Sequence, residues 1–268
     1  MILQDFHTHT TFSDGSNTPE EMIRAAIARG MKRIGFSDHS YTHFDERYCM
    51  RRSYVDEEPR AIAALREKYK GQIEVYSGVE QDYWSDAPTD GFDYVIGSVH
   101  YVRFGDEYIG MDEGADLFRY AAEKYCDGDA YQLTAAYFRT VADVKRKTGC
   151  DIVGHFDVIR KFNRGGVLFD ENDPRYLAAA FAAVDALIPT GVLFEINTGA
   201  VHGGYRDEPY PAPAIRDYIA AKGGRFILSS DSHATGTLLY GFDRFAPENA
   251  VTDGAWIRKN KKDKGADA

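Results

Sequence analysis

The sequence contains no long run of apolar residues. None of its hydrophobic stretches approaches the roughly 20 residues that a membrane-spanning helix requires, so we expect no transmembrane segment. The N-terminus also has no basic region followed by an apolar run, which argues against a secretory signal peptide. These two absences favour a soluble protein of the cytoplasm.

Cysteine and positive charge are both scarce. The three cysteines, Cys49, Cys126 and Cys150, form no C-x-x-C pair and no even set, so we expect free thiols in a reducing compartment. With 32 basic and 42 acidic residues the net charge is −10, which argues against a general affinity for the nucleic-acid backbone. A nuclease is not excluded, because metal ions can supply local positive charge.

The length of 268 residues allows one large α/β barrel or two smaller domains. The hydrophobic content of 44% and charged content of 28% are those of an ordinary globular protein. Neither an internal repeat nor a linker divides the chain. We therefore predict a single barrel domain over residues 1–250 and a polar C-terminal tail over residues 251–268.

Strands and helices are expected to alternate along most of the chain. Thr18-Pro19-Glu20-Glu21 predicts a capping box at the start of a helix that ends near Gly30. Strands are predicted at residues 2–7, 33–37, 73–79, 94–99, 151–154, 192–196 and 225–229, further helices at 56–70, 116–125, 131–148, 174–188 and 213–222, and a hairpin at 101–109. This alternation predicts a parallel sheet, and a closed or distorted barrel is the simplest arrangement for it.

The segment His7-Thr8-His9 is the first candidate for a functional site. In an extended strand, residues i and i+2 point to the same face, so the two imidazoles can be directed at one metal ion. Asp14 can return a carboxylate from the following turn. Taken alone, the pair could equally be two surface histidines.

Six of the eight histidines stand at the C-terminal ends of predicted strands: His7, His9, His39, His100, His155 and His233. Asp38, Glu80 and Asp231 occupy the same kind of position. In a βα barrel these ends meet at one face, where active sites form. Imidazoles and carboxylates without cysteine favour Zn²⁺, Mn²⁺ or Fe²⁺ over Mg²⁺ or Ca²⁺. Nine such donors exceed the coordination of one ion, so we predict two or three divalent ions, with Glu80 suited to bridge two of them.

Seven ordered motifs resemble those of the polymerase and histidinol phosphatase (PHP) superfamily. They are His7-Thr8-His9, Phe12-Ser13-Asp14-Gly15, Ser37-Asp38-His39, Gly78-Val79-Glu80, Gly97-Ser98-Val99-His100, Gly154-His155-Phe156-Asp157 and Ser230-Asp231-Ser232-His233. They span residues 2 to about 240. The chain length and the segment from Gly154 to Lys161 are most similar to the histidinol-phosphatase branch.

This resemblance implies a distorted (βα)7 TIM-like barrel with a trinuclear metal site at the C-terminal ends of the strands. It also implies which residues hold each ion. His7, His9, Glu80 and Asp231 would hold one ion, Glu80, His100 and His155 a second, and Asp14, His39 and His233 a third. The implied reaction is the hydrolysis of L-histidinol phosphate in histidine biosynthesis by a metal-activated hydroxide.

Positive side chains are also needed to bind the phosphoryl oxygens. Arg160, which follows His155 closely in the sequence, is the first candidate, because arginine binds phosphate in a bidentate manner. Lys161 and Arg206 are further candidates. For all three residues, a solvated surface charge is the alternative explanation.

Several polar residues near the strand ends receive roles that the sequence leaves open. Asp231 or His233 could transfer a proton to the leaving alkoxide while acting as a ligand. Asn197 and His202 follow the sixth strand and could contact substrate, or could be ordinary loop residues. Asp38 is expected to orient a metal-binding histidine, with the capping of the turn that follows it as the alternative.

Loop side chains could complete a small substrate pocket. Tyrosine and tryptophan are predicted at the active face at positions 41, 48, 83, 84, 101, 108 and 205. An acidic set, Asp82, Asp86, Asp106, Asp112 and Glu113, could attract a substrate ammonium, although solvated loop charge is the ordinary explanation.

Three alternatives to a histidinol phosphatase remain open. The chain could be a nuclease or a phosphoesterase that acts on nucleotides or other small phosphate esters. It could be a metal-stabilised interaction module without catalytic activity. An amidohydrolase barrel is a more distant possibility, but no predicted strand ends in the bridging lysine that such barrels commonly use. The expected partner is a small phosphate ester, without nucleic acid or membrane, and the sequence does not fix the oligomeric state.

Overall fold

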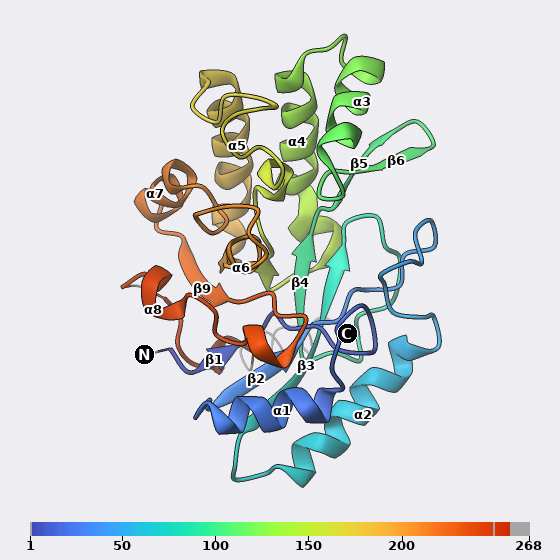
Figure 1. The fold of residues 1–268 in the computed structure, drawn as a ribbon, viewed down its shortest axis with the longest axis vertical. Coiled ribbons are helices and arrows are strands. Elements are labelled where there is room, and N and C mark those ends of the chain that lie inside the picture. The colour runs from blue at the N-terminus through green and yellow to red at the C-terminus, as the bar shows by residue number, and fades with distance from the viewer. Residues whose placement is uncertain (1, 249, 258–268) are drawn as a thin grey trace.

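Seven parallel strands form the centre of the molecule (Figure 1). The structure is a computed structural model that describes residues 2–248 and 250–257. The strands, in the order in which they pair, are β1 (Gln4–Asp5), β2 (Arg33–Phe36), β3 (Glu74–Asp82), β4 (Tyr94–Ser98), β7 (Ile152–Val153), β8 (Leu193–Asn197) and β9 (Arg225–Ser229). A parallel bridge between Thr8 and Ser232 links the segments that follow β1 and β9. The sheet is thus a nearly closed barrel, which confirms the predicted fold class.

Helices pack around this barrel and connect most of its strands (Figure 1). They are α1 (Pro19–Ala28), α2 (Tyr54–Lys68), α3 (Ala115–Tyr125), α4 (Ala130–Thr148), α5 (Pro174–Leu187), α6 (Gly199–His202), α7 (Pro213–Ala221) and α8 (Phe242–Phe245), with 3-10 turns η1 (Val158–Arg160), η2 (Ile188–Thr190) and η3 (Thr235–Thr237). The capping box predicted for α1 is present: the Thr18 side chain accepts from the Glu21 N–H, and the Glu21 carboxylate accepts from the Thr18 N–H at 2.8 Å. Within the described ranges, no helix is both long and apolar enough to cross a membrane.

The elements predicted from the sequence are present within a few residues of their expected bounds. The hairpin consists of β5 (Tyr101–Phe104) and β6 (Glu107–Gly110), and Gly105 takes a left-handed φ of 62° at its turn. No helix separates β3 from β4, as expected. The short helices α6 and α8 were not predicted, because four residues are too few to produce a recognisable helical period.

A single tyrosine fills much of the barrel interior near the N-terminal ends of the strands. Tyr94 on β4 is fully buried, and its hydroxyl donates to the backbone oxygens of Phe6 and Phe36 at 2.5 and 3.2 Å. Gly35 on β2 and Gly78 on β3 lie against the phenol, where a methyl group would come within 2.7 Å of neighbouring atoms. The absence of side chains on two adjacent strands therefore makes room for the large ring on a third.

We expect the substitution Gly78→Ala to destabilise the protein by about 2 kcal/mol or more. The added Cβ would lie 2.2 Å from Cζ of Tyr94, and the surrounding strands leave the ring little freedom to move. Urea unfolding measures the loss. Gly236→Ala is the control, because a Cβ at Gly236 meets open space. Equal stability of the two variants would contradict this account of the packing.

The start of the predicted tail packs under the barrel. The Val251 N–H donates to the Phe226 oxygen at 2.7 Å, and the Gln4 side chain donates to the Val251 oxygen at 2.8 Å. Trp256 is 6% exposed and lies edge-on to Phe6 and Tyr94, with ring centroids 5.4 and 5.7 Å away. Residues 251–257 are therefore not the polar tail that was expected, because their apolar side chains cover the barrel floor. Residues 258–268 lie outside the described residues.

Glu58 on α2 is a buried acid away from the pocket, and it should make stability depend on pH. Burial, together with the nearby Asp38, raises the pKa of Glu58 well above 4.5, and its Oε2 accepts from the Ser77 hydroxyl at 2.8 Å. Above the unfolded-state pKa the folded state retains the extra proton, so this group costs stability as the pH rises. We expect Glu58→Gln to raise stability at pH 8 by about 1–3 kcal/mol. Paired urea titrations at pH 8 and pH 4 test this, and a gain of equal size at both pH values would contradict it.

Candidate metal centre

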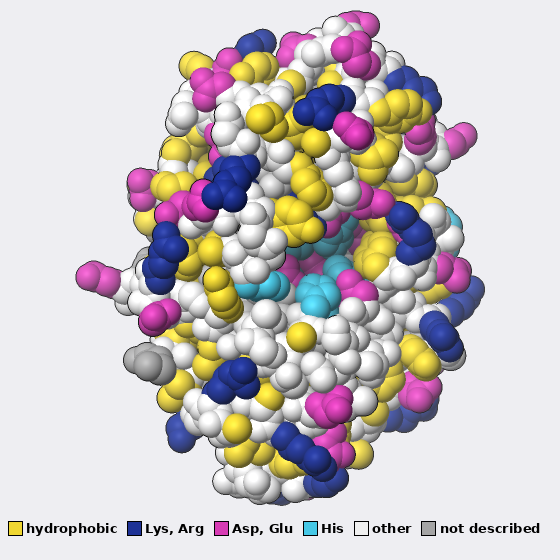
Figure 2. All heavy atoms as spheres, viewed as in Figure 1, with side chains coloured by type: hydrophobic (Ala, Val, Ile, Leu, Met, Phe, Trp, Pro, Cys, Tyr) yellow, Lys and Arg dark blue, Asp and Glu magenta, His cyan; other side chains and the backbone are white. Residues whose placement is uncertain are grey.

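Histidine and acidic side chains gather at the floor of a hollow in one face of the molecule (Figure 2). The hollow is a cavity of about 420 Å³ at the C-terminal ends of the barrel strands. Seven of the predicted metal ligands line it: Asp14, His39, Glu80, His100, His155, Asp231 and His233. His7 and His9 lie directly beneath them and are fully buried. The structure thus brings together all nine predicted metal ligands from distant parts of the sequence.

The carboxylate of Glu80, near the end of β3, is the centre of this cluster. Five imidazoles face its two oxygens. Oε1 lies 2.8 Å from His155 Nε2 and 3.3 Å from His100 Nε2, whereas Oε2 lies 2.8 Å from His39 Nδ1, 3.3 Å from His7 Nε2 and 3.6 Å from His9 Nε2. Each oxygen therefore faces a different set of histidines, as a bridging carboxylate requires.

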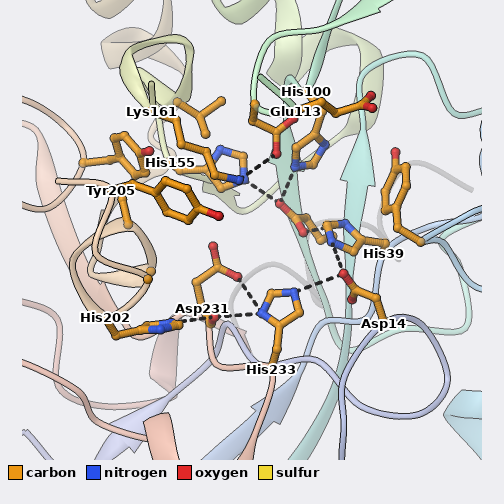
Figure 3. Close-up of a pocket in the computed structure, with 18 of the residues that line it drawn as sticks. Asp14, His39, His100, Glu113, His155, Lys161, His202, Tyr205, Asp231 and His233 are labelled. Atoms are coloured by element: carbon orange, nitrogen blue, oxygen red, sulfur yellow. Dashed lines mark hydrogen bonds and ion pairs between the residues drawn. The ribbon is translucent and has the colours of Figure 1, made fainter. Parts of the chain in front are cut away.

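Two further carboxylates close the cluster on the side of the first loop. Asp231 Oδ1 lies 3.2 Å from His9 Nε2. Asp14 Oδ2 lies 3.3 Å from His233 Nε2 (Figure 3). Asp231 has a φ of 55°, which is costly for a residue with a side chain and is typical of functional sites. This backbone conformation directs Asp231 toward the histidines that follow β1.

Unpaired atoms in the cluster show that a cation would fit there. His7 Nε2, both ring nitrogens of His9 and Glu80 Oε2 are buried and make no hydrogen bond. Buried polar atoms in this state cost about 1–3 kcal/mol each unless another partner satisfies them. Three sets have ligand atoms within 4.8 Å of one another: His9, Asp14, His39 and His233; His7, His9 and Glu80; and His39, Glu80 and His100. The site is therefore suited to divalent metal ions.

The protonation of two histidines also matches this environment. Burial, with the neighbouring imidazoles of His233 and His39, lowers the pKa of His9 to about 3, so this ring is neutral and can act as a ligand. Although burial opposes it, Asp14 raises the pKa of His233 to about 9. A metal ion at His233 must therefore displace a proton, so metal binding is expected to weaken as the pH falls.

Carboxylates outside the predicted ligand set orient the rings. Asp82 Oδ2 lies 3.2 Å from His100 Nδ1, and Glu195 Oε1 lies 2.6 Å from His7 Nδ1. Sequence reasoning assigned no role to Glu195. A usable signal was present, because a lone carboxylate within the apolar strand Val192–Ile196 must be paired if it is buried.

Asp38 does not orient a histidine. Its carboxylate accepts hydrogen bonds from the backbone N–H and the hydroxyl of Thr10, and likewise from the backbone N–H and the hydroxyl of Ser13. The expected alternative, the capping of the turn that follows Asp38, is not observed either, because the turn that Asp38 caps lies 25 to 28 residues earlier in the chain. By fixing the turn after His9, Asp38 holds the loop that carries Asp14.

Three of the five predicted substrate-binding residues lie outside the cavity lining. Arg160 is 2% exposed and donates to Glu171 at 3.1 Å, while Arg206 donates to both oxygens of the same carboxylate at 2.7 and 3.0 Å. Asn197 is fully buried and binds Glu195 and Asp231. This placement departs from the prediction, because Glu171 and Glu195 already engage these donors.

Lys161 and His202 do line the cavity, and so do several loop residues (Figure 3). Lys161 Nζ lies 3.4 Å from Asp112 Oδ2. Of the tyrosines expected at the active face, those at positions 48, 101 and 205 line the cavity, and of the acidic set only Asp112 and Glu113 do. Arg47, which was not predicted, pairs with Glu113 at 2.8 Å at the cavity wall. No local signal in the sequence distinguishes it from other loop arginines.

The fold and the site define a class: βα barrels that carry a site suited to metal ions at the C-terminal ends of their strands. Comparison with protein families gives the narrower assignment. Residues 5–199 match the model of the PHP domain, which covers more than half of the chain. The chain belongs to the PHP domain family.

Individual proteins support the same assignment. The chain is 30% identical over 256 residues to the probable histidinol-phosphatase of Deinococcus radiodurans, with 90% of each chain covered. The crystal structure of hisK from Listeria monocytogenes superposes with a TM-score of 0.78 at 19% identity and covers 91% of this chain and all of that one. The histidinol phosphate phosphatase of Lactococcus lactis, solved with zinc, L-histidinol and phosphate, gives a TM-score of 0.63 at 21% identity, with 97% and 92% covered. Both structures confirm the fold.

Proposed function

We propose that this chain is a metal-dependent phosphomonoesterase that hydrolyses L-histidinol phosphate to L-histidinol and phosphate in histidine biosynthesis. The observation that carries the proposal is the convergence of the nine histidine and carboxylate side chains around Glu80 at the floor of one cavity. The relative in Deinococcus radiodurans, which is similar over nine-tenths of both chains, supports the substrate. So does the zinc, L-histidinol and phosphate complex of the protein from Lactococcus lactis.

The proposed centre holds two or three divalent ions, Zn²⁺, Mn²⁺ or Fe²⁺. The ligands would be His7, His9, Glu80 and Asp231 for the first ion, Glu80, His100 and His155 for the second, and Asp14, His39 and His233 for the third. Glu80 Oε2 faces His7 and His9 and its Oε1 faces His100 and His155, which supports its place in both of the first two sets. His39 Nε2 lies 3.8 Å from Asp14 and its Nδ1 lies 2.8 Å from Glu80, so His39 connects the third set to the carboxylate shared by the other two.

When bound, the ions would supply Lewis acidity, which makes water a stronger nucleophile near neutral pH and neutralises charge on the phosphoryl oxygens. The chain's own residues would do the rest. Lys161 takes the place of Arg160 as the candidate that binds the phosphoryl oxygens, because its ammonium group lies at the cavity wall next to Asp112. Asp231 and His233 line the cavity and remain our candidates for moving protons between water and the leaving alkoxide.

The remaining walls suit a small cationic ester. A cavity of about 420 Å³ fits a substrate of histidinol-phosphate size. Asp112 and Glu113 are the acids through which this cavity would attract an ammonium group, and Tyr48 and Tyr205 supply flat surfaces for a ring. In the structure these acids are paired with Lys161 and Arg47, so a cationic substrate would share them with those side chains.

A phosphate-release panel tests the proposal. The purified chain, with its metal content measured, is assayed on L-histidinol phosphate, sugar phosphates, nucleotides and single-stranded DNA, with and without chelator. We expect chelator-sensitive release of phosphate that is fastest from L-histidinol phosphate. Release from another monoester alone would overturn the substrate but keep the reaction class. Degradation of DNA would favour a nuclease. If the protein is inactive on every ester and a chelator lowers its melting temperature, the chain is a metal-stabilised structural module.

A further inference from the structure

Glu195 lies within the barrel wall on β8, between apolar neighbours. It is fully buried and does not line the cavity, so it has no direct access to substrate. Its Oε1 accepts from His7 Nδ1 at 2.6 Å. Because Nδ1 of His7 carries the proton in this hydrogen bond, the lone pair on Nε2 is free to bind a metal ion. Nε2 faces Glu80 and Asp231, whose oxygens lie 3.3 and 3.5 Å away.

The second oxygen of Glu195 connects two more strands. Oε2 accepts from the backbone N–H of His155 at 2.7 Å and from Asn197 Nδ2 at 3.0 Å. The same amide nitrogen donates to Asp231 Oδ2 at 3.1 Å. The orientation of the amide is fixed, because Asn197 Oδ1 accepts from the Gly199 N–H at 2.8 Å.

Gly199 allows this close approach. A Cβ at position 199 would lie 2.9 Å from both Asn197 Oδ1 and the Asp231 side chain. Any larger residue would therefore push the Asn197 and Asp231 side chains away from each other. One carboxylate thus joins the segments after β1, β7 and β9, each of which carries a proposed metal ligand.

Only a carboxylate can serve in this place. All three groups that face Glu195 are donors, namely a ring N–H, a backbone N–H and an amide N–H. Glutamine offers one accepting oxygen and one donating nitrogen, so it would leave at least one of these donors facing another donor.

We propose that Glu195 is a positioning residue of the metal centre. It fixes the tautomer and orientation of His7. Through its hydrogen bonds to the His155 N–H and to Asn197, it also fixes the positions of His155 and Asp231 relative to His7 before metal binds. The inference rests on the ligand set of the proposed function, but it concerns metal affinity and not the substrate. Carboxylates that hold metal-binding histidines in this way are commonly worth 10- to 100-fold in metal affinity.

The test measures Zn²⁺ affinity of the full-length, metal-stripped protein by competition with a chromophoric chelator. The variants are Glu195→Gln and Asn197→Ala, the second of which removes the link from Glu195 to Asp231 but keeps the contacts of Glu195 with His7 and the His155 N–H. Glu58→Gln is the matched control, since Glu58 is equally buried and changes by the same substitution, but its carboxylate binds Ser77 away from the ligands. Melting curves of the metal-free proteins record any general loosening of the fold.

We expect Glu195→Gln to weaken Zn²⁺ binding 10- to 100-fold and Asn197→Ala to weaken it about tenfold, with Glu58→Gln at the wild-type value. Activity lost by the first two variants at limiting metal should return at saturating metal, which a merely structural defect would not allow. Wild-type affinity in Glu195→Gln would overturn the proposal. If that variant does not fold, Asn197→Ala decides: weaker binding supports the proposal and unchanged binding overturns it. A wild-type protein that binds metal but leaves L-histidinol phosphate intact would refute the proposed function alone.

Discussion

Replacing Glu80 by glutamine is expected to reduce phosphatase activity about 1,000-fold or more and to strip the site of metal. Five imidazole nitrogens face the two oxygens of this carboxylate, at distances from 2.8 to 3.6 Å. The glutamine amide nitrogen cannot bind a cation, so at least one of the two sets of histidines loses its shared ligand. A loss of 1,000-fold corresponds to about 4 kcal/mol of transition-state stabilisation.

The measurements are kcat/KM for L-histidinol phosphate and the metal content after gel filtration. Glu74→Gln is the control, because Glu74 begins the same strand at the opposite end of the barrel and its side chain is 47% exposed. It should keep its metal and its activity. A Glu80→Gln protein that retained full metal content and activity within tenfold of the wild type would remove Glu80 from the centre of the site.

A contrasting result is expected for Asp14→Ala. Asp14 faces His233, His39 and His9 but not Glu80, so its loss should weaken the ion assigned to Asp14, His39 and His233 and leave the ions shared by Glu80 in place. Metal content should therefore fall by about one equivalent. Unchanged metal stoichiometry would contradict the assignment of Asp14 to a separate ion.

The cluster of histidine and carboxylate side chains could be predicted because its signal is local. Alternation places His7 and His9 on one face of a strand, and the other candidates stand where predicted strands end. Parallel strands of a barrel all end at one rim, so positions that are far apart in the sequence meet without any need to know the helix packing. The same logic located Glu80 at the middle of the cluster.

Residues whose role depends on distant partners could not be placed in this way. Arg160 follows His155 by five residues, but the 3-10 turn Val158–Arg160 directs it inward to Glu171. The position of Glu195 in an apolar strand indicates that it needs a partner, but not that this partner is His7, which lies 188 residues earlier in the chain. Such pairs are fixed by tertiary packing, which neither periodicity nor strand-end position reveals.

The C-terminal boundary of the domain was misjudged for a related reason. Charge and lysine content near the end of the chain predicted a polar tail from residue 251, but Trp256 belongs to the barrel floor together with Phe6 and Tyr94. Two isolated apolar residues, Trp256 and Ile257, carry no period, so their burial could not be inferred from the pattern.

We therefore expect Trp256→Ala to destabilise the protein by about 3–5 kcal/mol, the cost of removing a buried aromatic side chain and leaving a cavity. For a chain of this size the melting temperature should fall by about 10 °C. Trp84→Ala is the matched control: Trp84 is only partly buried in a loop, and we expect it to cost less than half as much. Because Trp256 packs at the opposite end of the barrel interior from the metal centre, kcat/KM below the unfolding temperature should remain near that of the wild type. If the Trp256→Ala protein were as stable as the wild type, the packing of Trp256 would not stabilise the fold, and the predicted domain end at residue 250 would stand.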